Sequence, residues 1–276
     1  MIDLEAEYVN FAEVQDYLRD IGLWARDAAA YREAAGARAH LDLAYGDKAL
    51  QRLDVFTPAS GADGPVALFI HGGYWQAMDK SSFSHMARGA NEYGLTIAVV
   101  GYTLCPAATL SEIIDEIRQA VAFIAKRFSK RVTVFGHSAG GHLTACMLAT
   151  DWRAVDPSFD ADTVPAGLPI SGLFELEPLV STSVNVKLRL DVAEARRLSP
   201  LLWPAPVGKS VIAYVGGKES SEYRRQTRSL VARWRALGVE AIGVELSGAS
   251  HFTVIGPLAD PASLMTQDLV QLAKGR

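Results

Sequence analysis

Short runs of consecutive apolar residues recur along the chain, and longer amphipathic stretches separate them. The clearest run covers residues 66–70, where apolar residues follow one another without a polar position. Such a run is typical of a strand that is buried on both faces of a parallel sheet. The alternating stretch 53–56 ends shortly before Pro58 and predicts another strand. Similar apolar runs predict further strands over residues 95–100, 132–135, 211–215 and 239–246.

The amphipathic stretches between these strands predict helices. Thr109 and Glu112 have the spacing of a capping box, which opens a helix. The apolar face of that helix consists of Ile113, Ile117, Ala120, Val121, Ile124 and Phe128. A later helix ends at Gly238, and its apolar face consists of Tyr223, Thr227, Leu230, Val231, Trp234 and Leu237. The alternation of strands and helices predicts an α/β fold with a mostly parallel central sheet, covered by helices on both faces.

Two regions depart from this alternation. The N-terminal segment 1–40 is predicted to be helical and polar-faced, with helical spacing of Tyr17, Leu18, Ile21, Trp24 and Ala28. The region 150–205 is rich in proline and contains helical pieces such as 192–198, while 165–173 is the place where one strand is expected. We interpret the rest of this region as a small helical cap inserted above the sheet. The length of 276 residues then fits a single domain over 1–276.

The composition excludes several classes of protein. Apolar residues make up 49% of the chain and charged residues 21%, which is ordinary for a folded protein in water. The formal net charge of −4 provides no basic field that would attract nucleic acid or acidic lipid. The acidic N-terminus has no signal-peptide pattern, and no run approaches the ~18 apolar residues of a membrane span. We therefore expect a cytoplasmic protein without nucleic-acid or membrane partners, in which Cys105 and Cys146 are reduced.

The most informative segment for chemistry is Gly136-His137-Ser138-Ala139-Gly140, which directly follows the predicted strand 132–135. A Gly-x-Ser-x-Gly pattern between a buried strand and a helix is a nucleophile elbow, a sharp turn that exposes the serine hydroxyl above the sheet. The helix N-terminus favours negative charge that develops there. We expect Ser138 to be the nucleophile. The alternative is a glycine-rich structural turn, and the spacing does not match the Gly-x-Gly-x-x-Gly of a phosphate loop.

A second segment, His71-Gly72-Gly73, directly follows the strand 66–70. A glycine pair at this position lets backbone N–H groups approach the oxyanion of a tetrahedral intermediate, together with the N–H of the residue after the nucleophile. We therefore expect the oxyanion hole to consist of Gly72, Gly73 and Ala139. A tight loop at a strand end is the alternative. His71 opens this loop and is not expected to be the catalytic base.

The expected base is His251, which follows the last predicted strand and precedes the C-terminal helix. A neutral imidazole can take the serine proton and pass it to a leaving group near pH 7. The other histidines fit this role less well, because they precede the sheet, fall within predicted helices or are the neighbour of Ser138; they are His40, His85, His142 and His137. The histidines are scattered and no His-Glu-x-x-His is present, so neither a metal nor a cofactor is expected.

The acid that orients the base should lie between the serine and the histidine in chain order. Glu219 follows the strand 211–215 and would face the same loops as the serine, so it is the favoured candidate. Glu222 is the competing carboxylate. It falls in the first turn of the next predicted helix, where a negative charge also has a stabilising role.

These motifs resemble the α/β-hydrolases of the esterase group, and more narrowly the arylformamidases (kynurenine formamidases) of serine-hydrolase type. The match spans nearly the whole chain in order and rests on 43–46 with 53–56, on His-Gly-Gly-Tyr-Trp at 71–75, on 136–143, on the cap stretch 185–200 and on Glu-Ser-x-Glu-Tyr at 219–223. The first three stretches are shared with many esterases, whereas the last two are more particular. This chain has a glutamate at 219, where many relatives have an aspartate.

The resemblance implies an α/β-hydrolase fold and hydrolysis of N-formyl-L-kynurenine to kynurenine and formate, with esterase activity on small acyl esters. Stacking on an aryl leaving group is expected for Tyr74, Trp75 and Phe252, with packing in the core as the alternative. Asn185 in the cap is a further candidate for substrate binding, with hydrogen bonds to nearby backbone groups as the alternative. The competing functions are a carboxylesterase for short-chain or aryl esters and a non-catalytic binding protein. The partner expected in each enzymatic case is a small ester or formamide, while the sequence does not report an oligomeric state.

Overall fold

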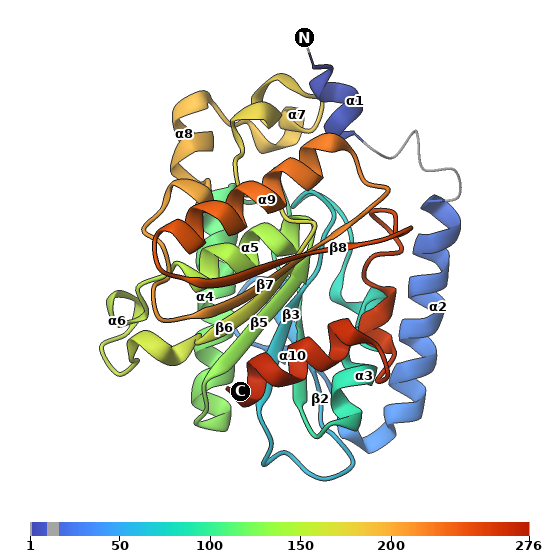
Figure 1. Cartoon of the computed structure of the whole chain (residues 1–276). Helices are drawn as coiled ribbons and strands as arrows, with labels where there is room; N and C mark the ends of the chain where they lie inside the picture. Colours follow the sequence, from blue (N-terminus) through green and yellow to red (C-terminus); the bar gives the residue numbers. More distant parts are fainter. Residues whose placement is uncertain (1, 10–16, 276) are drawn as a thin grey trace.

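An eight-stranded sheet runs through the computed structural model, which describes residues 2–9 and 17–275 (Figure 1). The strand order across the sheet is β1-β2-β4-β3-β5-β6-β7-β8. The strands are β1 (Ala39–Ala44), β2 (Arg52–Phe56), β3 (Val66–Ile70), β4 (Thr96–Val100), β5 (Val132–His137), β6 (Ala166–Ile170), β7 (Ser210–Gly216) and β8 (Glu240–Leu246). Only β2 runs antiparallel to its neighbours, and all other neighbouring strands pair in parallel. The predicted α/β fold with a mostly parallel sheet is therefore confirmed.

Helices cover both faces of the sheet (Figure 1). One face packs against α4 (Leu110–Phe128), α5 (Ala139–Leu148) and α9 (Ser221–Ala236). The other face packs against α2 (Tyr17–Ala35), α3 (Arg88–Glu92) and α10 (Leu264–Lys274). The predicted capping box at the start of α4 is confirmed, since Thr109 and Glu112 hydrogen-bond each other's backbone N–H.

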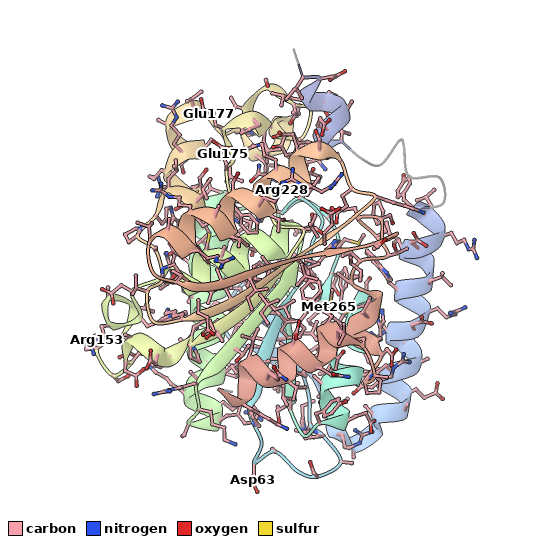
Figure 2. The ribbon with its side chains drawn as sticks, in the orientation of Figure 1. Asp63, Arg153, Glu175, Glu177, Arg228 and Met265 are labelled. Atoms are coloured by element: carbon pink, nitrogen blue, oxygen red, sulfur yellow. The ribbon has the colours of Figure 1, made fainter. Side chains whose placement is uncertain are left out.

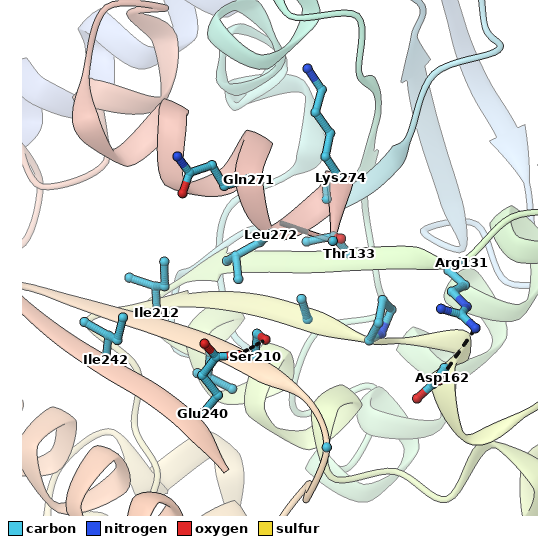
Figure 3. Close-up of a pocket in the computed structure, with 16 residues that line it drawn as sticks. Arg131, Thr133, Asp162, Ser210, Ile212, Glu240, Ile242, Gln271, Leu272 and Lys274 are labelled. Carbon is cyan, nitrogen blue, oxygen red and sulfur yellow. Dashed lines mark hydrogen bonds and ion pairs between the residues drawn. The ribbon is translucent and has the colours of Figure 1, made fainter.

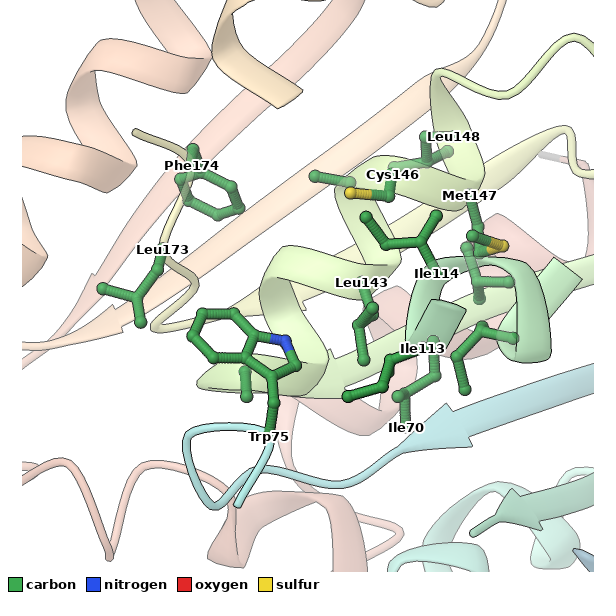
Figure 4. Packing of buried hydrophobic residues seen from close by; sticks show 14 of the residues in the cluster. Ile70, Trp75, Ile113, Ile114, Leu143, Cys146, Met147, Leu148, Leu173 and Phe174 are labelled. Atoms are coloured by element: carbon green, nitrogen blue, oxygen red, sulfur yellow. The ribbon is translucent and has the colours of Figure 1, made fainter. Parts of the chain in front are cut away.

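The hydrophobic core is divided by the sheet into two layers, because neighbouring residues of a strand point to opposite faces. In β3, Leu68 and Ile70 join the layer under α4 and α5, whereas Ala67 and Phe69 join the layer under α2 and α10. Figure 4 shows the first layer around Trp75. In the second layer, Met265 of α10 is buried, while charged residues such as Arg153 and Asp63 lie at the surface (Figure 2).

The proline-rich region contains β6, which confirms the strand expected within 165–173, and several short helices. These are α6 (Trp152–Val155), α7 (Asn185–Leu188) and α8 (Val192–Arg197). In Figure 1, α7 and α8 lie beyond one end of the sheet, beside α1 (Leu4–Tyr8). Glu5 of α1 accepts hydrogen bonds from the backbone N–H and the hydroxyl of Ser183, so the N-terminus is attached to this part of the chain.

The edge strand β1 was not predicted from the sequence. Its side chains are exposed or half-buried, so the strand lacks the apolar run that marks inner strands such as β3 and β4. Its pairing with β2 is irregular between His40 and Leu43, where Asp42 has a φ of 55°. Asp42 and Asp54 both accept hydrogen bonds from the buried Lys80 at 2.7 Å, and this ion-paired group ties the edge of the sheet to the loop after β3.

The remaining helical turns are short 3₁₀ segments, namely Gly36–Arg38, Lys80–Ser82, Ser84–Ala87, Ala161–Thr163, Glu177–Ser181, Pro200–Leu202 and Gly256–Ala259. None of the helices in the described part of the chain combines the length and apolar character that crossing a membrane requires.

Candidate active site

Ser138 occupies the sharp turn between β5 and α5. Its backbone has φ 56° and ψ −116°, a conformation that non-glycine residues rarely adopt. The turn is possible because its flanking residues lack a side chain: a Cβ on Gly140 would lie 1.9 Å from the carbonyl oxygen of Ile70. A Cβ on Gly136 would lie 2.5 Å from the carbonyl oxygen of Gly140. The Ser138 N–H donates to Ile170 at 2.8 Å, which ties the turn to β6.

Three side chains from separate loops meet at this turn. The Ser138 Oγ lies 3.0 Å from Nε2 of His251, and Nδ1 of His251 lies 2.7 Å from Oε2 of Glu219. The second Glu219 oxygen accepts hydrogen bonds from the Ser171 hydroxyl at 2.5 Å and from the Gly216 N–H at 2.6 Å. An ionised carboxylate only accepts, so its bond to Nδ1 directs the imidazole proton there and leaves Nε2 as an acceptor for the serine proton.

Glu222, the competing carboxylate, serves a different cluster. It accepts a hydrogen bond from the Tyr8 hydroxyl at 2.6 Å and two from the Arg225 guanidinium at 2.7 and 2.8 Å. These bonds to Arg225 hold the pKa of the Glu222 carboxyl below its usual value despite its partial burial. The structure thus brings Glu219, and not Glu222, against the imidazole of His251.

The glycines after β3 approach the serine closely. A Cβ on Gly72 would lie 2.9 Å from the carbonyl oxygen of His137 and 3.1 Å from the Ser138 Cβ, while Gly73 has a φ of +105°. Within the described residues, no acceptor takes a hydrogen bond from the N–H groups of Gly72, Gly73 or Ala139. These three groups are therefore available to an oxyanion formed on the acyl carbon.

Two other histidines near the serine are held neutral by burial. His71 is stacked between Phe83 and Tyr102, and burial lowers the pKa of its imidazole to about 4. The His137 ring lies 4.7 Å from the His251 ring and shares a 2.8 Å hydrogen bond with the His251 carbonyl oxygen. Burial, and then the neighbouring His251, lower the pKa of His137 well below its usual value. His137, the residue before the serine, thus contacts the loop that carries the candidate base His251. The position of His137 in the Gly-x-Ser-x-Gly motif did not indicate this contact.

A small cavity of about 30 Å³ opens at the Ser138 side chain. It is lined by Trp24, Gly72, Gly73, Tyr74, Met78, Phe83, His137, Ser138, His251 and Phe252. Trp24 comes from the N-terminal helix α2, and its ring centroid lies 5.3 Å from Phe83 and 6.0 Å from Phe252. The sequence placed Trp24 only on the apolar face of a helix, because nothing in the pattern indicated what that face would cover.

The four expected substrate contacts separate into two groups. Tyr74 and Phe252 line the cavity, whereas the expectation for Trp75 and Asn185 has to be corrected. Trp75 is fully buried in the layer under α4 and α5, where its ring meets His142 edge-on at 5.0 Å (Figure 4). The amide of Asn185 donates to the carbonyls of Val180 and Leu190 and accepts from the Leu190 N–H, so it holds the turn around α7.

Tyrosines complete one side of the site. The ring of Tyr223, on α9, lies 4.6 Å from the His251 ring, and the Tyr223 hydroxyl lies 2.6 Å from that of Tyr74. The Tyr74 hydroxyl in turn donates to the carbonyl oxygen of Tyr8 on α1. The sequence pattern indicated no role in the site for Tyr223 or Tyr8, because these contacts join residues from three distant parts of the chain.

A larger groove of about 570 Å³ lies elsewhere, at the amino ends of the parallel strands (Figure 3). Two pairs of polar residues lie in it: Ser210 donates to Glu240 at 2.6 Å, and Arg131 lies 3.6 Å from Asp162. Ligands of open parallel sheets bind at the opposite, carboxyl ends of the strands. Ser138 follows the carboxyl end of β5, so the small cavity is the candidate active site. Among the described residues, no group of three His, Cys, Asp or Glu side chains is arranged to hold a metal ion.

The fold and the strand–serine–helix turn define the class of this protein as an α/β-hydrolase. The BD-FAE family model matches residues 53–164. The kynurenine formamidase of Drosophila melanogaster is 30% identical over 226 residues, which cover 77% of this chain and 74% of that protein. The kynurenine formamidase of Danio rerio is 29% identical over 240 residues, which cover 84% of this chain and 81% of that protein.

One solved structure has the same fold as this chain over nearly the whole length of both chains. The crystal structure of a putative thioesterase from a Silicibacter species has a TM-score of 0.89 and 37% identity, and the alignment covers 99% of this chain and 100% of that chain. The chain belongs to the kynurenine formamidase family of α/β-hydrolases.

Proposed function

We propose that this protein is a serine hydrolase that cleaves aryl formamides, with N-formyl-L-kynurenine as substrate and kynurenine and formate as products. The observation that carries the proposal is the size of the cavity at Ser138, about 30 Å³. One ordered water molecule needs at least about 10–15 Å³ of such a cavity. The space at Ser138 is therefore only a little larger than a water molecule needs, and it suits an acyl group without a side chain. The similarity to the kynurenine formamidases of two animals supports the same substrate class.

The proposed reaction passes through an acyl-enzyme. Ser138 Oγ attacks the formyl carbon while its proton moves to Nε2 of His251, and Glu219 stabilises the imidazolium through Nδ1. The oxyanion accepts hydrogen bonds from Gly72, Gly73 and Ala139. The bond between carbon and the leaving nitrogen then breaks as that nitrogen takes the proton from His251. A water molecule, deprotonated by the same imidazole, releases formate from Ser138.

The aromatic residues around the cavity suit an aryl leaving group. Phe252, Trp24 and Tyr74 surround the serine, and aromatic rings pack well against one another in offset or edge-to-face contacts. A carboxylesterase for short-chain or aryl esters is the competing function, because the same serine, base and oxyanion groups serve both reactions.

The test compares kcat/KM of the purified protein on N-formyl-L-kynurenine with that on 4-nitrophenyl acetate and 4-nitrophenyl butyrate. We expect turnover of the formamide and a preference for acetate over butyrate, and Ser138→Ala should lower each rate by about 10⁴-fold or more. Negligible formamide turnover beside rapid ester hydrolysis would favour the carboxylesterase. An inert protein would favour a binding role, and full activity of Ser138→Ala would exclude the proposed nucleophile.

A further inference from the structure

The turn that carries His251 is attached to the sheet by a histidine side chain. Within the turn, Val254 donates to the Ser250 carbonyl at 3.0 Å, and the Ser250 N–H donates to the Thr253 hydroxyl at 2.9 Å. The carbonyl oxygen of His251 instead meets the imidazole of His137, whose Nε2 lies 2.8 Å away. No other donor in the described part of the chain hydrogen-bonds this carbonyl. His137 thus links the backbone of the candidate base to the strand that ends at the serine.

The imidazole of His137 is itself held in one place. His137 is the last residue of β5, where it pairs with Ile170 of β6, and its side chain is buried. Its ring meets Trp24 edge-on at 6.2 Å between ring centroids, and a Cβ on Gly72 would lie 3.3 Å from its Nδ1. Because these contacts leave the ring little freedom to rotate, Nε2 stays directed at the His251 carbonyl.

The bond to the carbonyl also fixes the tautomer of His137. A carbonyl oxygen only accepts, so the proton of the neutral imidazole lies on Nε2 and the lone pair lies on Nδ1. Burial, and then the neighbouring His251, lower the pKa of His137 well below its usual value, so the ring stays neutral. A neutral ring places no positive charge 4.7 Å from the ring of His251, which becomes an imidazolium in the proposed reaction.

We propose that His137 is a positioning residue for the base: its Nε2–H holds the His251 backbone where the imidazole reaches both Ser138 and Glu219. The inference rests on the proposed function, in which His251 moves the proton. The imidazole must keep 3.0 Å to Ser138 Oγ and 2.7 Å to the Glu219 carboxylate at the same time. Without the bond to His137, the turn shifts relative to the serine. A displacement of about 1 Å in a reacting group lowers a rate roughly 100-fold.

The test compares His137→Leu with His137→Gln on 4-nitrophenyl acetate, with thermal unfolding of each variant. The amide nitrogen of glutamine is as many bonds from Cβ as Nε2 is in histidine, so His137→Gln restores the donor and His137→Leu does not. We expect kcat to fall roughly 100-fold in His137→Leu and to recover to within about tenfold of the wild type in His137→Gln, while KM changes less than about threefold. If His137→Leu does not fold, His137→Asn takes its place, because its amide nitrogen ends one bond short.

His142→Leu is the matched control. His142 is also a fully buried histidine whose Nε2 shares a hydrogen bond with a backbone carbonyl, that of Leu198 at 2.9 Å, but this bond does not involve the turn of His251. The variant should lose stability and keep kcat within about fivefold of the wild type. A drop in kcat as large as that of His137→Leu would assign both effects to lost packing and would overturn the proposal.

A double-mutant cycle separates positioning of the base from general damage to the site. His251→Ala keeps the backbone carbonyl and removes the base, so adding His137→Leu should lower the residual rate less than about threefold. A loss as large as in the wild-type background would place the effect on the serine or the oxyanion groups and would overturn the proposal. Equal kcat losses in His137→Leu and His137→Gln, or wild-type kcat in a folded His137→Leu, would overturn it as well.

Failure of the proposed function has a different signature. A wild-type protein that hydrolyses neither 4-nitrophenyl acetate nor N-formyl-L-kynurenine would overturn the proposed function together with the role of His137, and so would a fully active His251→Ala. When the wild type is active and depends on His251, a negative result in the comparison or in the cycle overturns only the role of His137.

Discussion

Replacing Glu219 with glutamine tests whether its carboxylate sets the tautomer of His251. The Glu219 side chain is fully buried, and all its hydrogen bonds are accepted: one from Nδ1 of His251, one from the Ser171 hydroxyl and one from the Gly216 N–H. Glutamine has the same shape but only one accepting oxygen. Its NH₂ group must face either the imidazole or the Gly216 N–H, so one donor in the pocket loses its acceptor.

Both orientations of the glutamine are unfavourable for catalysis. An NH₂ group facing Nδ1 makes this nitrogen an acceptor and moves the imidazole proton to Nε2, where it faces Ser138 and blocks proton removal. An NH₂ group facing Gly216 instead leaves a buried N–H unsatisfied, at a cost of about 1–3 kcal/mol. The imidazolium also loses its negative partner in either case. We expect kcat to fall about 10³- to 10⁴-fold, the effect known for such tautomer-setting carboxylates.

The assay measures kcat and kcat/KM on 4-nitrophenyl acetate for the wild type, Glu219→Gln and Glu222→Gln, with thermal unfolding of each variant. Glu222→Gln is the matched control, because it makes the same chemical change in the Tyr8–Arg225 cluster, and it should retain activity within about fivefold. A folded Glu219→Gln that kept more than about a tenth of the wild-type kcat would contradict this role of Glu219. An equally large loss of kcat in Glu222→Gln would contradict it as well.

Three further predictions concern the elbow, the cavity and the buried charge. Gly140→Ala forces a Cβ to 1.9 Å from the Ile70 carbonyl and should cost more than about 3 kcal/mol in unfolding free energy, whereas Gly22→Ala, with open space around it on α2, should cost nothing. Trp24→Ala should lower stability by about 3 kcal/mol and raise the butyrate-to-acetate ratio of kcat/KM roughly tenfold. Burial lowers the pKa of Lys209 from 10.5 to about 8. The folded state therefore binds fewer protons between these values, and urea unfolding should show the wild type gaining up to about 3 kcal/mol over Lys209→Met as the pH rises from 8 to 10.5.

Most strands of the sheet and the elbow could be predicted from neighbouring residues in the sequence. The apolar runs of β3, β4, β5 and β7 predict strands because a parallel sheet buries both faces of its inner strands, and this requirement is visible in neighbouring residues. The Gly-x-Ser-x-Gly turn is equally local, since the contacts that exclude a Cβ at Gly136 arise within the turn itself and at the adjacent strand β3. The edge strand β1 escaped detection because an exposed strand needs no apolar run.

The side chains that surround the serine could not be predicted from the sequence, because they come together only in the folded chain. Trp75 and Tyr74 are neighbours in one motif, yet the first is buried in the core and the second lines the cavity. Trp24 and Tyr223 reach the site from helices at opposite ends of the chain, and no local pattern encodes that meeting. Likewise, the sequence left both Glu219 and Glu222, three residues apart, as candidate partners of His251. The packing of α1 on α9 brings Glu222 to the Tyr8 hydroxyl, whereas Glu219 hydrogen-bonds the His251 imidazole. Local geometry can be read from neighbouring residues, whereas contacts between distant segments depend on how the layers pack.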